Sequence, residues 1–293
     1  MEHASGILVL DKPAGISSAA ALRPLKARLG RKVRVGHAGT LDPFATGVVL
    51  ALVGDATRLS DLAMTLRKRY LATVRFGTST DTLDSTGTVD ATRAEDEGPP
   101  PGLEEALDGF RGRIEQVPPA YSALKVDGQR AYKKARGGEP VALAPREVVC
   151  KSIELVSVAW PVAVVRLVTG RGFYVRSFAR DWGAAVGWPA HLQALRREAI
   201  GPFEAAGGVA PDEAGAEHVW PPRSIVEGAG IRIARIGRDD ARRFVTGRTV
   251  EWSGENGEVA AMCEDRLLGL GQAVHGVVRP NVVLAGARRE FEQ

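Results

Sequence analysis

The stretch of this chain whose residue types best suit chemistry is a glycine-rich loop that carries one acid. Residues 36–47 read GHAGTLDPFATG, with three glycines and a single carboxylate, Asp42. The glycines allow sharp turns and a close approach to a ligand, and Pro43 restricts Asp42 to an extended or turn conformation. Such a loop could hold a catalytic carboxylate in a fixed position. On spacing alone, an Asp-Pro turn that caps the next element explains these residues better.

Sequence motifs for nucleotide cofactors and metals are missing. There is no GxxxxGK[ST] stretch, and no GxGxxG follows an expected strand. The five histidines are scattered, and Cys150 and Cys263 lie far apart, so neither a zinc motif nor a disulfide framework is present. We therefore expect no cofactor and no structural metal.

Basic residues are concentrated in a few stretches, although the net charge is only +4. Residues 23–34 contain six basic residues and no acid, and further clusters lie at 67–69, 125–136 and 232–248, whereas acids gather at 95–108. A solvated helix face explains any one cluster. All four together favour a track for a nucleic acid. Aromatic residues make up only 6%, which argues against an extended stacking surface for single strands.

The pattern of apolar and turn residues predicts an α+β fold. Strands are expected at 7–10, 70–76 and 162–168, and 48–53 is a buried strand or the start of a helix. Helices are expected around Leu22–Leu29, after a cap at Ser17 or Ser18, and at 103–110, 173–186 and 191–197. Strands and helices do not alternate strictly, which argues against a doubly wound parallel sheet.

Composition also predicts two domains. Residues 205–230 are rich in Gly, Ala and Pro and indicate a connector. Short strands at 231–233, 259–263, 267–270 and 282–284 and a helix at 239–245 follow it. We expect a main domain over 1–228, with an excursion at about 118–150, and a small β-rich module over 229–293. No apolar run approaches a membrane span, and the N-terminus lacks a secretory pattern. We expect a cytoplasmic monomer.

Six motifs in order over about residues 6–203 together resemble the TruB family of pseudouridine synthases, which act on uridine 55 of bacterial tRNA. They are GILVLDKPAGISS, GHAGTLDPFATGVVL, RKRYLATVRFGTSTDTLDSTGTV, PPAYSALKVDGQRAYKKARGGE, GRGFYVRSFARDWG and HLQALRREAIGPF. The C-terminal module resembles a PUA-type RNA-binding domain more loosely. The resemblance implies the pseudouridine synthase fold, with a mixed, largely antiparallel central sheet flanked by helices.

The resemblance also implies the reaction and its residues. Uridine of the tRNA T arm would be flipped out and isomerised without a cofactor or a required protein partner, with Asp42 as the essential carboxylate. Tyr70 would stack on the target base and serve in the late proton removal at C5, and Arg176 would pair with Asp42. The remaining residues would contact the substrate or its RNA: His37, Tyr174, Leu195, Lys125, Arg130, Lys133 and Lys134.

Several alternatives stay open. Tyr70 and Leu195 could be ordinary core residues, Arg176 a surface ion-pair residue and His37 a surface residue. Asp42 could attack C1′, attack C6 or remove the C2′ proton. The chain could also be a non-catalytic RNA-binding or tRNA-folding protein on the same fold. A sugar-acting hydrolase is less consistent, since the loop has no second carboxylate.

Overall fold

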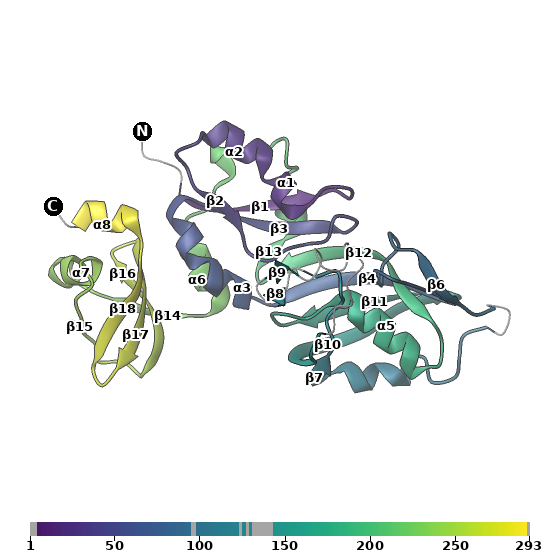
Figure 1. Ribbon diagram of the computed structural model, residues 1–293. Helices are drawn as coiled ribbons and strands as arrows, with labels where there is room; N and C mark the ends of the chain where they lie inside the picture. The colour runs from purple at the N-terminus through teal and green to yellow at the C-terminus, as the bar shows by residue number, and fades with distance from the viewer. Residues whose placement is uncertain (1–4, 95–97, 123–124, 127–128, 131–142, 292–293) are drawn as a thin grey trace.

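The computed structural model describes residues 5–94, 98–122, 125–126, 129–130 and 143–291, and these form a long central sheet and a smaller second sheet (Figure 1). The strands of the central sheet are β1 (Gly6–Lys12), β2 (Val35–His37), β3 (Thr46–Val53), β4 (Lys68–Phe76), β7 (Gly112–Gln116), β10 (Arg146–Ala159), β11 (Val162–Thr169), β12 (Ala190–Ile200) and β13 (Phe203–Glu204).

The central sheet is mixed but largely antiparallel. Its main order is β1-β3-β12-β4-β11-β10-β7, with β2 paired to β3 and β13 paired to β12. Only β3 and β12 run parallel among the pairs of this sheet in the described part of the chain. The α+β prediction is therefore confirmed. Strand β3 is buried along nearly its whole length, and its register with β1 and β12 places the glycine-rich loop at one end of the sheet.

Helices and short 3-10 turns cover the sheet and link its strands. They are α1 (Ser18–Ala21), α2 (Arg23–Leu29), η1 (Gly54–Leu59), α3 (Ser60–Thr65), η2 (Glu105–Phe110), α5 (Val175–Ala185), η3 (Ala205–Gly207), η4 (Ala216–His218) and α6 (Arg223–Ala229). The Ser17 side chain caps α1 by accepting a hydrogen bond from Ala20 N, and α2 begins as a separate helix with Pro24 in its first turn. Because proline suits only the first turn of a helix, it separates the two segments.

The expectation of a helix at 191–197 is wrong, because these residues lie within strand β12. Leu192 and Leu195 are both buried, and their spacing of three residues imitates a helical period. The pairing of β12 with β4 explains this spacing of buried residues in a strand, since a register shift between Leu192 and Ala194 marks a bulge. A bulge adds one residue to a strand and so interrupts the alternation of period two.

The second sheet lies in the C-terminal part of the chain, as the sequence predicts. Its order is β14-β16-β17-β18-β15. Its elements, with two helices, are β14 (Arg232–Arg235), α7 (Arg238–Val245), β15 (Val250–Glu251), β16 (Gly257–Cys263), β17 (Arg266–Val274), β18 (Val277–Val283) and α8 (Ala285–Phe291). Figure 1 shows it as a lobe beside α3 and α6. One buried apolar cluster runs from Leu62 and Leu66 through Ile225 to Phe244 and Leu268, so the two parts share core contacts.

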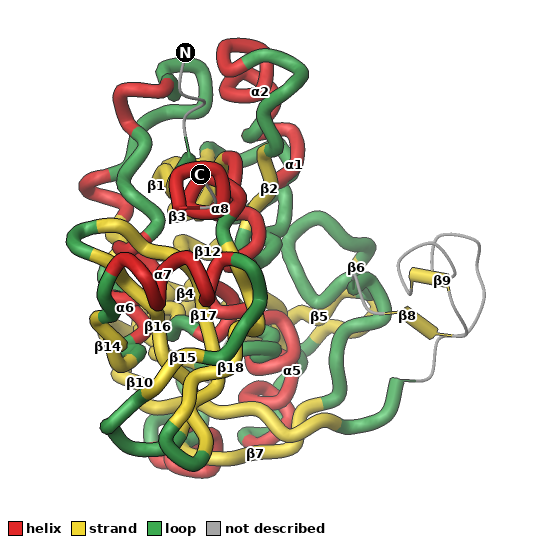
Figure 2. The backbone as a smooth tube through the Cα atoms, turned by 90° about the vertical axis from the view of Figure 1, so that its left-hand side faces the viewer, coloured by secondary structure: helices red, strands yellow, loops and turns green. Residues whose placement is uncertain are grey.

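The chain leaves the central sheet between β7 and β10, after Gln116 and before Arg146, which pair with each other; residues 146–150, which the predicted excursion of about 118–150 includes, belong to β10. The excursion contains the two-residue strands β8 (Lys125–Val126) and β9 (Gln129–Arg130), and Figure 2 shows them standing away from the sheet. Lys125 pairs with Arg130 through the backbone. Lys133 and Lys134 lie outside the described residues. A separate two-stranded sheet joins β5 (Thr78–Thr80) to β6 (Val89–Thr92).

Candidate active site

The glycine-rich loop joins β2 to β3 and places Asp42 at the end of the central sheet. Gly47, the second residue of β3, has φ of +103°, and a Cβ built there would lie 2.2 Å from the carbonyl oxygen of Arg197 on β12. Only glycine permits both this conformation and this approach. Ser18 fixes the middle of the loop, because its hydroxyl accepts a hydrogen bond from Leu41 N (2.8 Å) and donates one to Leu41 O (2.9 Å).

Arg176 reaches Asp42 from the first turn of α5. Its Nε lies 2.9 Å from Asp42 Oδ2, an ion pair by distance without hydrogen-bond alignment at Nε. The Arg176 side chain is 6% exposed, whereas the Asp42 side chain is 34% exposed. The carboxylate is therefore held from the protein side and remains accessible from the solvent side. The structure thus brings together the two residues that the sequence analysis paired.

The same guanidinium also binds two further loops. Its Nη1 donates to Thr82 O (3.0 Å) and lies 3.5 Å from Asp84 Oδ2, and its Nη2 donates to Tyr121 O (2.9 Å). Asp84 is buried, and its Oδ1 accepts hydrogen bonds from Thr82 Oγ1, Thr86 N and Thr86 Oγ1. Sequence reasoning missed Asp84. The signal was the TLDST turn, because an aspartate in a turn commonly accepts a hydrogen bond from the backbone N–H two residues later, here that of Thr86.

Lys12 is a second residue that sequence reasoning missed. It is completely buried, and its Nζ donates to Pro13 O (2.8 Å), Ile16 O (2.9 Å) and Pro43 O (3.2 Å). The ammonium thereby joins the turn after β1 to the residue next to Asp42. Burial lowers the pKa of Lys12 to about 8; the nearby Asp42 carboxylate opposes this shift and Arg197 adds to it.

Tyr70 and Leu195 lie on neighbouring strands and face the same side of the sheet. Tyr70 on β4 pairs with Arg197 on β12, and Leu195 pairs with Ala72, so the two side chains are diagonal neighbours. Both residues are 8% exposed and belong to one buried apolar cluster that includes Leu41 from the Asp42 loop. Tyr70 and Leu195 thus belong to the apolar wall beside the Asp42 loop.

Tyr174 and His37 are both half-buried. Tyr174 is the extended residue before α5, and the Gln116 side chain holds its backbone by accepting from Tyr174 N (2.7 Å) and donating to Tyr174 O (3.0 Å). Burial raises the pKa of the Tyr174 phenol. His37 ends β2, and its buried Nδ1 has no hydrogen-bond partner among the described residues. Burial, and secondarily Arg197, lowers the pKa of His37, which favours a neutral ring.

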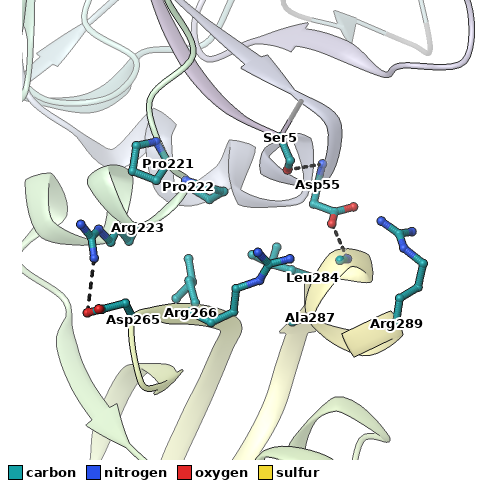
Figure 3. Close-up of a pocket in the computed structure, with 12 residues that line it drawn as sticks. Ser5, Asp55, Pro221, Pro222, Arg223, Asp265, Arg266, Leu284, Ala287 and Arg289 are labelled. Atoms are coloured by element: carbon teal, nitrogen blue, oxygen red, sulfur yellow. Dashed lines mark hydrogen bonds and ion pairs between the residues drawn. The ribbon is translucent and has the colours of Figure 1, made fainter. Parts of the chain in front are cut away.

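Within the described ranges, no group of three or more His, Cys, Asp or Glu side chains could hold a metal ion. The helices of the described chain are all too short or too polar to cross a membrane. A cavity of about 350 Å³ lies away from Asp42, between η1, α6 and the second sheet (Figure 3).

Comparison with known proteins decides the family. Residues 26–175, which include Asp42, Tyr70, Asp84 and Tyr174, match the TruB family pseudouridylate synthase N-terminal domain. The chain belongs to this family. As a TruB-family pseudouridylate synthase it is an isomerase, and the predicted family membership is confirmed.

Full-length relatives support the same assignment. The tRNA pseudouridine synthase B of Thermobifida fusca is 39% identical over 97% of this chain and 100% of that protein. The protein of the same name from Azoarcus is 36% identical over 96% of this chain and 95% of its own length. A crystal structure of a Cbf5–Nop10–Gar1 complex contains a chain with the same fold, with a TM-score of 0.70, 22% identity and coverage of 97% of this chain and 86% of that chain.

Proposed function

We propose that this TruB-family protein isomerises uridine 55 in the T arm of tRNA, with Asp42 as the essential catalytic residue. The observation that carries the proposal is the Asp42–Arg176 ion pair, which lies beside the apolar wall formed by Tyr70 and Leu195. The relatives named tRNA pseudouridine synthase B, which match nearly the full chain, support tRNA as the substrate.

The reaction requires a carboxylate and no redox chemistry. The N1–C1′ bond of uridine breaks, the uracil rotates, a C5–C1′ bond forms, and the C5 proton leaves while N1 gains one. A carboxylate at the Asp42 position can start this sequence as a nucleophile or as a base. Arg176 fixes the orientation of the carboxylate, and Tyr70 lies on the wall where the base would stack. Tyr70 is our candidate for removal of the C5 proton.

The target base must leave its stack to reach Asp42. His37, in the Asp42 loop, and Tyr174, two residues before Arg176, are half-buried and would contact the flipped nucleotide or its neighbours. Basic residues of two segments would bind the phosphates around the flipped nucleotide. In residues 23–34, Lys26 and Arg31 line a hollow that also contains Val35 of β2. In the 118–150 excursion the basic residues are Lys125, Arg130, Lys133 and Lys134. The module over 229–293 would contact tRNA away from the reacting base.

The test is pseudouridine mapping on an unmodified tRNA transcript incubated with the purified chain. We expect one modified position, uridine 55, in the full tRNA and in an isolated T-arm hairpin. A transcript with cytidine at position 55 is the matched control. Tight tRNA binding without any pseudouridine would instead support the tRNA-folding alternative, and pseudouridine at another position would contradict the T-arm assignment.

A further inference from the structure

Arg197 is fully buried, and its guanidinium binds the backbone on both sides of Asp42. It lies on β12 and is 1% exposed. Its Nη2 donates to Gly39 O (3.2 Å) and its Nη1 to Thr40 O (3.2 Å), before Asp42 in the chain, and its Nε donates to Val48 O (2.7 Å), after it. One planar group therefore joins the start of the loop to the strand that follows it.

The backbone of Arg197 pairs with both neighbouring strands of the site. On one side it faces Gly47 of β3, where a Cβ could not fit, and on the other side it pairs with Tyr70 of β4. Directly paired residues of neighbouring strands point to the same face of a sheet. Arg197 thus lies between the loop that carries Asp42 and the strand that carries Tyr70. A displacement of Arg197 would shift both of them.

The charge of Arg197 is unusual for its location. Within the described chain, its three hydrogen bonds all go to carbonyl oxygens, and no carboxylate lies within 4.0 Å of its nitrogens. An unpaired charge in a protein interior is unfavourable unless its hydrogen bonds are fully satisfied. Its field also contributes to the lowered pKa values of His37 and Lys12. The groups that compensate this charge are the backbone carbonyl oxygens before and after Asp42.

We propose that Arg197 is a positioning residue, which fixes the backbone on both sides of Asp42 so that the carboxylate meets Arg176 and the target nucleotide. The planar fork of arginine can serve three acceptors at fixed angles. A lysine at this position carries the same charge but a single nitrogen, which cannot span Gly39, Thr40 and Val48. The guanidinium geometry, rather than the charge alone, is therefore required.

The test compares Arg197→Lys and Arg197→Gln with Arg166→Lys, which alters a guanidinium on β11 that binds Glu198 and Glu154. Single-turnover pseudouridine formation at saturating tRNA is the first readout, and tRNA affinity is measured in parallel. We expect both Arg197 variants to lose roughly a hundredfold or more in rate, since a displacement of about 1 Å suffices for such a loss. Their tRNA affinity, and the rate of Arg166→Lys, should stay close to wild type.

Hydrogen exchange without tRNA separates positioning from general stability. The loop amides of Ala38, Leu41 and Ala45 bond to Leu50 O, Ser18 Oγ and Asp42 O. In Arg197→Lys these three amides should exchange faster while the amides of β4 and β11 keep their protection. This readout does not need pseudouridine formation, so it tests Arg197 independently of the proposed function on which the rate measurement rests.

Three outcomes would overturn the assignment. A normal single-turnover rate in Arg197→Lys would show that the guanidinium geometry is not needed. A slower rate with a uniform loss of protection across β3, β4 and β12 would show a general structural role. The same conclusion would follow if neither Arg197 variant folds where Arg166→Lys does. If the wild type itself forms no pseudouridine, the proposed function fails, whereas the exchange result still decides the role of Arg197.

Discussion

Arg176 Nε lies 2.9 Å from Oδ2 of Asp42, and this contact joins the first turn of α5 to the glycine-rich loop between β2 and β3. The arginine is buried and the carboxylate is partly exposed, so the pair presents an oriented anion to a substrate. Because Arg176 also binds Thr82 O and Tyr121 O, one side chain sets the relative position of three loops.

Replacing Arg176 by Lys should therefore reduce catalysis far more than binding. Lysine retains the charge but cannot contact Asp42, Thr82 O and Tyr121 O together. We expect single-turnover pseudouridine formation to fall roughly a hundredfold, with tRNA affinity nearly unchanged. Arg180→Lys is the matched control, since Arg180 lies one turn later on α5 and binds Asp181 and Val117 O. Equal rates for the two variants would contradict the role of Arg176.

Asp84→Asn tests the second carboxylate near Arg176. Asparagine can still accept from Thr86 N, but its amide would place a donor beside the guanidinium. A buried group left without its partner typically costs about 1–3 kcal/mol, so we expect a loss of that size in the free energy of unfolding and a slower single-turnover rate. Asp81→Asn, in the same loop but exposed and bonded to Thr88 N, should change both quantities much less. The proposed support of Arg176 is wrong if Asp84→Asn matches this control.

The sequence alone could identify the Asp42 loop because its signal is local: glycines, a proline and one acid within twelve residues. The partner Arg176 followed only from family resemblance, since nothing in residues 171–184 points to residue 42. Lys12, Asp84 and Arg197 were missed for a physical reason. Each is a buried charged residue with at least one polar contact to a distant segment: Lys12 to Pro43, Asp84 to Arg176, and Arg197 to Gly39, Thr40 and Val48. Such contacts leave no periodic pattern in the sequence. The bulge in β12 likewise depends on its pairing with β4.

The lowered pKa of Lys12 predicts opposite effects of pH on the single-turnover rate and on the free energy of unfolding. With a pKa of about 8, its ammonium loses a proton as the pH rises through that value, and one of its three carbonyl contacts loses its donor. The single-turnover rate should therefore fall above about pH 8. In the unfolded chain the lysine still holds its proton up to about 10.5, so the unfolded state binds more protons between these values. The contribution of Lys12 to the free energy of unfolding should accordingly rise with pH in this window.

The control for this prediction is Lys12→Met, compared with wild type from pH 7 to 10.5. The variant should be slower at neutral pH and should lack the part of the alkaline decline that Lys12 causes. Its stability difference from wild type should shift in favour of wild type as the pH rises. A parallel pH dependence of rate and stability in both proteins would exclude Lys12 as the titrating group.

The basic segments predict a steep salt dependence of tRNA binding. Each phosphate contact should contribute a slope of roughly −0.7 to −0.9 in a plot of log affinity against log salt. Charge reversal at exposed Lys26 and Arg31, or at Lys133 and Lys134, should weaken binding and flatten this slope. Charge reversal at Glu104 and Glu105, in the acidic stretch, is the control and should not weaken binding. If the tRNA affinity of the wild type did not change with salt concentration, binding of tRNA phosphates by the basic segments would be contradicted.

Asp55 connects the two parts of the chain at the cavity in Figure 3. Its Oδ2 accepts a hydrogen bond from Gly286 N in the first turn of α8, and its own N–H donates to Ser5 Oγ (3.0 Å). It therefore acts as a helix cap supplied by the other part of the chain. Asp55→Ala should lower the free energy of unfolding by about 1 kcal/mol and leave the single-turnover rate at saturating tRNA unchanged. Asp265→Ala, on the opposite wall, is the control. An altered single-turnover rate in Asp55→Ala would show that this contact between the two parts of the chain contributes to catalysis.

The most direct test of the central claim is single-turnover pseudouridine formation by Asp42→Asn at saturating tRNA, with tRNA binding measured in parallel. Asparagine is nearly isosteric and caps a turn about as well as aspartate, so the loop should persist, but the amide is neither a base nor a nucleophile at neutral pH. We predict no detectable pseudouridine and nearly normal tRNA affinity. Near-normal pseudouridine formation by Asp42→Asn would contradict the catalytic assignment and leave Asp42 as a turn-capping residue.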